Sequence, residues 1–87
     1  MKTVHYPING ELDLHTFHPK DVKDLVPEYI QACRDEGIYQ IRIIHGKGKG
    51  VLRKMIHSIL DSDSDVDNYW QEGNTGSWGA TIVKLKE

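Results

Sequence analysis

A glycine- and lysine-rich loop at residues 45–50, with the sequence HGKGKG, separates two apolar runs of different period. Residues 39–44 before it form a short run rich in isoleucine, which is typical of a buried strand. Residues 51–60 after it repeat apolar side chains at the spacing of one helix face. The chain must therefore pass from a strand to a helix through a loop whose glycines allow backbone angles that other residues avoid.

The composition of this loop is that of a phosphate-binding segment. Unpaired backbone N–H groups at the N-terminus of a helix attract anions, and the helix dipole adds to that attraction. Lys47, Lys49, Arg53 and Lys54 supply positive charge, with no acidic residue from position 45 to position 60. Relief of backbone strain would explain the glycines but not the lysines between them. The spacing differs from the nucleotide P-loop and from the dinucleotide fingerprint, so neither of those motifs is present.

The chain is long enough for one domain with one core and one surface site. It has 87 residues, of which 38% are hydrophobic and 28% charged, as in ordinary globular proteins. No apolar run approaches the ~20 residues of a membrane helix, and residues 1–7 lack the apolar stretch of a secretory signal. The single cysteine, Cys33, lies on an apolar helix stripe. We expect a cytoplasmic protein with a buried, unreactive thiol.

The net charge of −2 argues against a nucleic-acid-binding surface that covers the whole molecule. Positive charge is concentrated at positions 47–54, whereas four aspartates alternate with other residues through positions 61–67. If nucleic acid binds, we expect it to bind one small face weakly and to need a partner or an oligomer for tight binding.

Periodicity and turn residues predict an α/β fold. The expected order is strand, helix, strand, helix, strand and strand, with the strands at residues 11–15, 39–44, 66–72 and 79–86. The first helix should start near Pro19 and run to residue 36, and the second should span residues 51–60. Residues 1–10 should form an irregular arm, because Pro7 and the pair Asn9 and Gly10 interrupt a regular ladder. Pro27 conflicts with the first helix, so we expect a kink or a break between Lys23 and Pro27.

The connections between the strands predict how the strands pair. The first two strands are joined by a helix and should be parallel. The last two are joined by a turn-rich segment and should form a hairpin, with alternate residues such as Thr81 facing the core. Ligands of open α/β sheets bind beyond the carboxyl ends of parallel strands, where His15 and His45 lie.

Three segments together resemble one known family. Residues 12–15 read LDLH, residues 44–48 read IHGKG, and residues 76–85 read GSWGATIVKL. In this order they are similar to the L-D-L-H, H-G-K-G and G-x-x-G-A-T-x-V-x-L motifs of the Smr (small MutS-related) domain family. Thr16 and Phe17 follow the first motif, where many members have glycine. We associate that variant with short stand-alone bacterial members.

The resemblance implies a two-layer α/β sandwich like the C-terminal domain of translation initiation factor three. A four-stranded mixed sheet would carry both helices on one face, with an arm at residues 1–10 and the Smr domain at residues 11–87. The resemblance also implies binding of DNA or RNA and endonuclease activity. Members fused to MutS-like ATPases nick DNA, and others cleave RNA, including messenger RNA on stalled ribosomes. A membrane partner is not expected.

The motifs of the family point to specific residues, and the chemistry of phosphodiester hydrolysis supports them. That reaction needs a base, an acid and positive charge on the phosphate. Asp13, His15 and His45 are the catalytic candidates. His15 or Asp13 could act as the base and His45 as the acid, and Asp13 could instead orient His15. The candidates for contacts to nucleic acid are Gly46, Lys47, Gly48, Lys49, Gly50, Arg53, Lys54, Gly76, Trp78 and Gly79.

A resident metal site is not expected, because one carboxylate and one imidazole supply too few ligands. Asp13 together with a substrate phosphate could still recruit a magnesium or manganese ion. The pair His15 and His18 lacks further ligands for zinc. Residues 61–72 deviate from a calcium-binding loop, because Val66 replaces the glycine of its sharp turn.

Three functions stay open at the level of sequence. The first is a nuclease, the second is a non-catalytic module that docks on nucleic acid or on the ribosome through the same loop, and the third is a pocket for a small phosphate ligand. Trp78 in the glycine-rich turn is the expected base-stacking residue, whereas Trp70 is expected to pack within its strand. The oligomeric state is not predicted.

Overall fold

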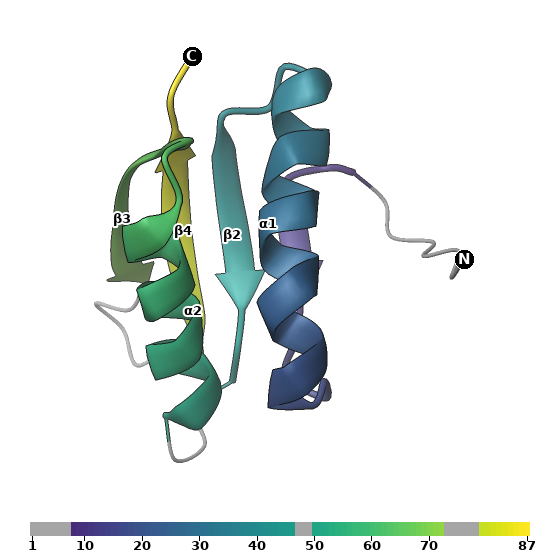
Figure 1. Cartoon of the computed structure of the whole chain (residues 1–87), viewed down its shortest axis with the longest axis vertical. Helices are drawn as coiled ribbons and strands as arrows, with labels where there is room; N and C mark the ends of the chain where they lie inside the picture. Colours follow the sequence, from purple (N-terminus) through teal and green to yellow (C-terminus); the bar gives the residue numbers. More distant parts are fainter. Residues whose placement is uncertain (1–7, 47–49, 73–78) are drawn as a thin grey trace.

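Six elements of secondary structure form in the predicted order. The computed structural model describes residues 8–46, 50–72 and 79–87. Along the chain it contains β1 (Glu11–Asp13), α1 (Pro19–Asp35), β2 (Gln40–Ile44), α2 (Val51–Ser62), β3 (Val66–Glu72) and β4 (Ala80–Leu85). Both helices cover the same face of a four-stranded sheet (Figure 1). The expected two-layer α/β sandwich is confirmed.

The sheet has the strand order β1-β2-β4-β3. β1 and β2 are parallel, and Asp13 and Ile44 are partners at their carboxyl ends. β4 lies antiparallel to both of its neighbours, β2 and β3. The predicted parallel and antiparallel pairs are therefore confirmed, and most of the turn expected between β3 and β4 lies outside the described residues. Parallel pairing brings the ends of β1 and β2 to the same edge of the sheet, where the candidate site forms.

The core lies between the sheet and the helices, because strand residues alternate between the two faces of the sheet. Leu12, Leu14, Ile41 and Ile43 are fully or almost fully buried on the helix side. α1 adds a stripe of buried residues at helical spacing, namely Val22, Val26, Tyr29, Ile30 and Cys33. α2 adds Ile56 and Leu60. Val51, expected on the same stripe, is instead exposed where that helix begins.

α1 runs through Pro27 without a break, so of the expected kink or break the break does not occur. An interior proline lacks the N–H that would bond to the carbonyl of Lys23, at a cost of ~3 kcal/mol. Val26 and Ile30 on either side of Pro27 are fully buried. Their burial contributes ~1.5–3 kcal/mol each and offsets that cost. The helix ends before Gly37, as predicted, and this glycine has a φ of 76°.

The face of the sheet opposite the helices is called the open face below. Strand register and alternation place on it the side chains of Glu11, Asp13, Arg42, Ile44, Asn68, Trp70, Glu72, Ile82 and Lys84. Arg42 donates hydrogen bonds to Glu72 at 2.9 to 3.1 Å and to Glu11 at 3.1 Å, so one guanidinium ties β2 to β3 and β1. Trp70 is 44% exposed on this face. The expectation that it packs within its strand is therefore wrong.

Two further predictions concern Cys33 and the membrane. Cys33 is free and fully buried, and this burial raises the pKa of its thiol, so the predicted buried cysteine is confirmed. In the part of the chain that the structure describes, no helix has the length and apolar character needed to cross a bilayer.

Candidate functional site

The carboxyl end of β1 presents a carboxylate and an imidazole to solvent. Leu12 and Leu14 point into the core, so Asp13 between them points to the open face. The backbone N–H of Leu14 donates to the carbonyl of Ile44 at 2.7 Å and extends the parallel pairing beyond β1. His15 follows at once. The side chains of His15 and Asp13 are 55% and 51% exposed, so the strand register delivers both to the molecular surface.

Asp13 and His15 form a hydrogen-bonded pair. Oδ1 of Asp13 accepts from Nδ1–H of His15 at 2.5 Å and from the backbone N–H of His15 at 3.1 Å. The side-chain hydrogen bond from His15 is the main reason why the pKa of Asp13 is lowered, although partial burial acts in the opposite direction. The ionised carboxylate selects the Nδ1–H tautomer of a neutral His15. Nε2 of His15 is then left with a lone pair that can take a proton.

Two glycines allow the segment after β2 to approach His15. Gly46 has a φ of 84°, and a Cβ added there would lie 3.3 Å from Cβ of His15. Gly79 lies against Gly46, since a Cβ added to Gly79 would lie 3.4 Å from Cα of Gly46. The carbonyl of Gly79 accepts the backbone N–H groups of His45 at 2.7 Å and of Gly46 at 2.9 Å. The structure thus brings together three predicted site residues from the ends of β1 and β2 and the start of β4.

The N-terminus of α2 supplies the cationic part of the candidate site. Gly50 precedes the helix with a left-handed φ of 80°, and a Cβ there would meet the guanidinium of Arg53 at 3.0 Å. Arg53 and Lys54 follow in a first turn that has no acidic residue. Such a helix end attracts anions. The other predicted residues of the loop and of the turn before β4 lie outside the described residues, namely Lys47, Gly48, Lys49, Gly76 and Trp78.

His45 points into the protein rather than toward solvent. It is 4% exposed, with Nδ1 at 3.0 Å from the carbonyl oxygen of Gly46 and Nε2 at 2.9 Å from Oγ1 of Thr81. The same Oγ1 lies 2.8 Å from Nε2 of His57 on α2. The ring of His57 in turn contacts the ring of Tyr69 on β3, with centroids 4.9 Å apart. Two hydrogen bonds to Thr81 and one ring contact therefore connect the end of β2 with β4, α2 and β3.

The hydrogen-bond partners of His45, Thr81 and His57 fix where the protons of these side chains lie. The carbonyl of Gly46 can only accept, so Nδ1 of His45 carries a proton and Nε2 of a neutral ring is an acceptor. The hydroxyl of Thr81 then donates to His45 and accepts from Nε2–H of His57. A second proton on His45 would displace the hydroxyl proton of Thr81 from its acceptor. These hydrogen bonds thus favour a neutral His45. A general acid would have to carry the second ring proton.

The environment lowers the pKa of both of these histidines. Burial is the main cause of the lowered pKa of His45, with the positive charge of Arg53 in the same direction and the bond to Gly46 opposing. Burial also leads for the pKa of His57, followed by the charges of His45 and Arg53, while Asp61 opposes. Both rings are therefore disfavoured as cations in the folded state.

We expect the free energy of unfolding to fall as the pH drops below about 6.5, the ordinary pKa of histidine. The unfolded state takes up protons at His45 and His57 more readily than the folded state. The contribution of the two rings to the free energy of unfolding is therefore fully present above that pH and is lost as the pH falls through the lowered pKa values of the folded state. Urea unfolding at pH 7, 6 and 5 measures the effect. His57→Gln keeps a donor for Thr81 without titrating, and should give a shallower dependence. Stability that stays constant or rises from pH 7 to pH 5 would contradict the assignment.

His57 and Thr81 are not among the residues predicted for the site. Thr81 is predicted to face the core, and a buried hydroxyl needs a hydrogen-bond partner, so its position is an available signal. His57 carries no comparable signal, because its partner lies 24 residues away on another element.

The acidic segment after α2 has internal partners. Asp61 accepts the hydroxyl of Tyr69 at 2.6 Å, and Asp63 accepts the backbone N–H of Asp65 at 2.8 Å. Asp65 pairs with Arg34 at 3.1 Å. These contacts account for three of the four aspartates as structural residues. Within residues 8–46, 50–72 and 79–87, no three His, Cys, Asp or Glu side chains are grouped as metal ligands.

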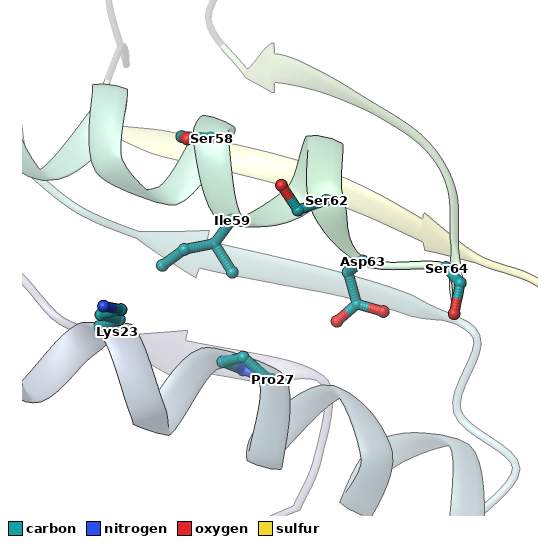
Figure 2. A pocket seen from close by; sticks show the side chains of 7 residues that line it. All are labelled: Lys23, Pro27, Ser58, Ile59, Ser62, Asp63 and Ser64. Atoms are coloured by element: carbon teal, nitrogen blue, oxygen red, sulfur yellow. The ribbon is translucent and has the colours of Figure 1, made fainter.

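A groove of about 520 Å³ runs between the two helices (Figure 2). Lys23 and Pro27 of α1 line one side, and Ser58, Ile59 and Ser62 of α2 line the other. None of its lining residues belongs to the predicted site. The pair formed by Asp13 and His15 thus lies on an open surface, away from this groove.

Similarity to known proteins extends over the whole folded region. The family model of the Smr domain matches residues 12–86. The chain is 39% identical over 80 residues to Endonuclease MutS2 of Finegoldia magna, and the alignment covers 91% of this chain and 10% of that protein. It is 37% identical over 87 residues to Endonuclease MutS2 of a Geobacillus species, and this alignment covers 99% of this chain and 11% of that protein. The chain therefore spans about a tenth of the length of these curated relatives.

Two solved structures share the fold. The Smr domain of Thermus thermophilus MutS2 matches with a TM-score of 0.83 and 29% identity, covering 88% of this chain and 98% of that one. YdaL, a stand-alone small MutS-related protein from Escherichia coli, matches with a TM-score of 0.83 and 27% identity, covering 95% of this chain and 69% of that one.

Proposed function

Because the chain belongs to the Smr domain family, we propose that it binds nucleic acid and cleaves a phosphodiester bond at Asp13 and His15. The observation that carries this proposal is the pair itself, an exposed imidazole held by an ionised carboxylate. The cationic N-terminus of α2 starts only a few residues after Gly46, which approaches His15. A base and a cationic phosphate site are what cleavage requires. The name of the relatives, Endonuclease MutS2, supports the reaction class.

Nε2 of His15 acts as the base. Asp13 holds the ring through Nδ1 and stabilises the positive charge that the ring gains. With RNA, Nε2 takes the proton of the 2′-hydroxyl, and that oxygen attacks phosphorus while the bond to the 5′ oxygen breaks. The leaving oxygen takes a proton from water, which gives a 2′,3′-cyclic phosphate and a 5′-hydroxyl. With DNA, a water molecule replaces the 2′-hydroxyl as the nucleophile.

We assign His45 a positioning role in place of the acid role expected from the sequence. Its ring is bound to Thr81, and its backbone N–H is bound to the carbonyl of Gly79. It therefore anchors the start of the phosphate-binding loop at the end of β2. The described residues form no metal site around Asp13 and His15, so no step is assigned to a magnesium or manganese ion.

An exposed pair suits a polymer better than a small phosphate ligand. Small-molecule sites enclose about 70–90% of the ligand surface. Asp13 and His15 are half exposed, and the groove between the helices contains neither of them. A nucleic-acid strand can reach such a surface. Docking on the ribosome in the cytoplasm would use the same surface, and co-sedimentation of the purified chain with ribosomes tests it.

Incubation of the purified chain with end-labelled single-stranded and double-stranded RNA and DNA tests the cleavage proposal, with EDTA in half of the reactions. We expect cleavage of RNA that persists in EDTA and leaves a 2′,3′-cyclic phosphate. Binding without cleavage of any substrate would replace the nuclease by a non-catalytic binding module. Complete inhibition by EDTA, or 5′-phosphate products, would assign Asp13 to a metal ion instead of the imidazole alone.

We expect phosphate contacts to come from Lys47, Lys49, Arg53 and Lys54. Engagement of about three phosphates should give a slope of roughly −2 to −3 when the logarithm of the binding constant is plotted against that of the salt concentration. Arg53→Gln with Lys54→Gln should make this slope shallower, and Lys47→Gln with Lys49→Gln should do the same. Arg34→Gln with Lys86→Gln removes the same charge at the opposite end of the domain, at the last turn of α1 and after β4, and serves as the control. An unchanged slope in both loop variants would move the binding surface elsewhere.

A further inference from the structure

We propose that the open face of the sheet binds unpaired nucleotides of the substrate, with Trp70 as the residue on which a base stacks. The inference rests on the proposed function, since it concerns the same nucleic acid. It assigns to Trp70 on β3 the stacking role that the sequence places on Trp78.

Trp70 has the position and exposure of a binding residue. It is one of only three large hydrophobic side chains exposed among the described residues, and the only aromatic one. It pairs across the sheet with Ile82 of β4, which is partly buried. Ile82 is thus the cross-strand neighbour of Trp70, and 44% of Trp70 stays exposed on the open face. Aromatic side chains on the open face of a four-stranded sheet are a known way to stack unpaired bases.

The open face is continuous with the catalytic pair. Asp13 projects from the same face as Trp70, because both alternate with residues that point toward the helices. In the register of the sheet, Asp13 lies in one row with Ile44, Ala80 and Glu72, and Trp70 lies two residues before Glu72. Three strand spacings and two residues separate them by roughly 16 Å. A single strand that is cleaved beside His15 and continues across the sheet therefore reaches Trp70 within a few nucleotides.

The charges on the open face favour stacking of uncharged bases together with contact to one phosphate. Glu11 and Glu72 are both bound by Arg42, and Asp13 is bound by His15, so the carboxylates near the path are paired. Lys84 is exposed on β4 opposite Asn68 and takes part in none of the ion pairs formed within the described ranges. Lys84 is the cation available to a phosphate on this face. Binding here should depend on bases more than on salt.

The test measures binding of fluorescently labelled single strands of about eight nucleotides, as RNA and as DNA, to the full chain carrying His15→Ala, so that no strand is cleaved during the titration. In that background Trp70→Ala should weaken binding about 5- to 150-fold. Trp70→Phe, which keeps an aromatic ring, should restore most of the affinity. Trp70→Leu, which keeps apolar area without a ring, should not restore it.

Two matched controls separate stacking from other effects. A strand of the same length with abasic positions should bind equally to the Trp70→Ala variant and to its parent, because it offers no base to stack. The salt slope should stay unchanged in Trp70→Ala and become shallower by about 0.7 in Lys84→Gln, the value for one phosphate of a single strand. Circular dichroism melting of each variant shows that the fold is retained.

Three other outcomes would each overturn the inference. Equal affinity of Trp70→Ala and its parent for the intact strand would overturn this inference and leave the proposed function standing. No binding of any nucleic acid by the parent chain would instead overturn the proposed function, and this inference with it. Concentration-dependent self-association that Trp70→Ala abolishes would also overturn the inference, because the open face would then be an interface between copies of the chain.

Discussion

Replacing His15 with alanine should lower the rate of cleavage by about 10²- to 10⁴-fold, the usual effect of losing a general base. The ring is 55% exposed and packs little, so the fold should be retained. Binding of the substrate should also change little, because the phosphate contacts are expected from the loop and α2. Single-turnover cleavage, with binding measured in parallel, tests both parts.

Asp13→Asn is the informative companion to His15→Ala. An amide can no longer stabilise the imidazolium, and it can turn its NH2 group toward Nδ1 and select the wrong tautomer of His15. Cleavage should therefore fall although both side chains keep their size. If His15→Ala cleaves as fast as its parent from pH 5 to pH 9, His15 has no part in the reaction. If cleavage and thermal stability disappear together, His15 is a structural residue.

Replacing Gly46 with alanine should lower cleavage by up to about 10²-fold, which is the effect of moving a catalytic group by roughly 1 Å. Alanine at a φ of 84° is strained, at a cost of ~1–2 kcal/mol, and its Cβ would press on Cβ of His15 at 3.3 Å. Either His15 or the loop has to move. Urea unfolding and single-turnover cleavage measure the two effects separately.

Gly37→Ala is a matched control for that strain. Gly37 has a φ of 76°, and a Cβ there would meet nothing within 4 Å. It follows α1, at the end of the helix remote from the turn that leads from His15 into Pro19. We expect Gly37→Ala to lose a similar stability and to cleave normally. If Gly46→Ala cleaves as well as Gly37→Ala, the close approach of Gly46 to His15 does not matter for the reaction.

The sequence alone predicts those features whose residue pattern lies within a single helix or strand. Alternation around Asp13 and the helical spacing of Val22, Val26 and Ile30 predict their burial correctly, because each pattern reports on one face of one element. The helix is unbroken at Pro27, where a kink or a break was expected, because the local propensity was outweighed by burial on both sides of it. Trp70 was predicted wrongly, because alternation does not tell which face of a strand a sheet leaves uncovered.

The candidate site was predictable only in part, for the same reason. The position of Asp13 and His15 at the end of a strand follows from the sequence, and the parallel neighbour follows from the helix that joins the two strands. The direction of the His45 ring does not follow. It depends on Thr81 and His57, which reach it from distant parts of the chain.

The shortness of β1 has a consequence for local unfolding. This edge strand has three residues, and two further backbone bonds extend its pairing, from Arg42 to the carbonyl of Gly10 and from Leu14 to that of Ile44. Edge strands with few bonds open at a free energy well below that of the whole domain. The pair of Asp13 and His15 therefore sits on a segment that can detach while the rest of the sheet stays folded. Amide exchange at Leu14 would report that opening, and a bound substrate that touches His15 would slow it.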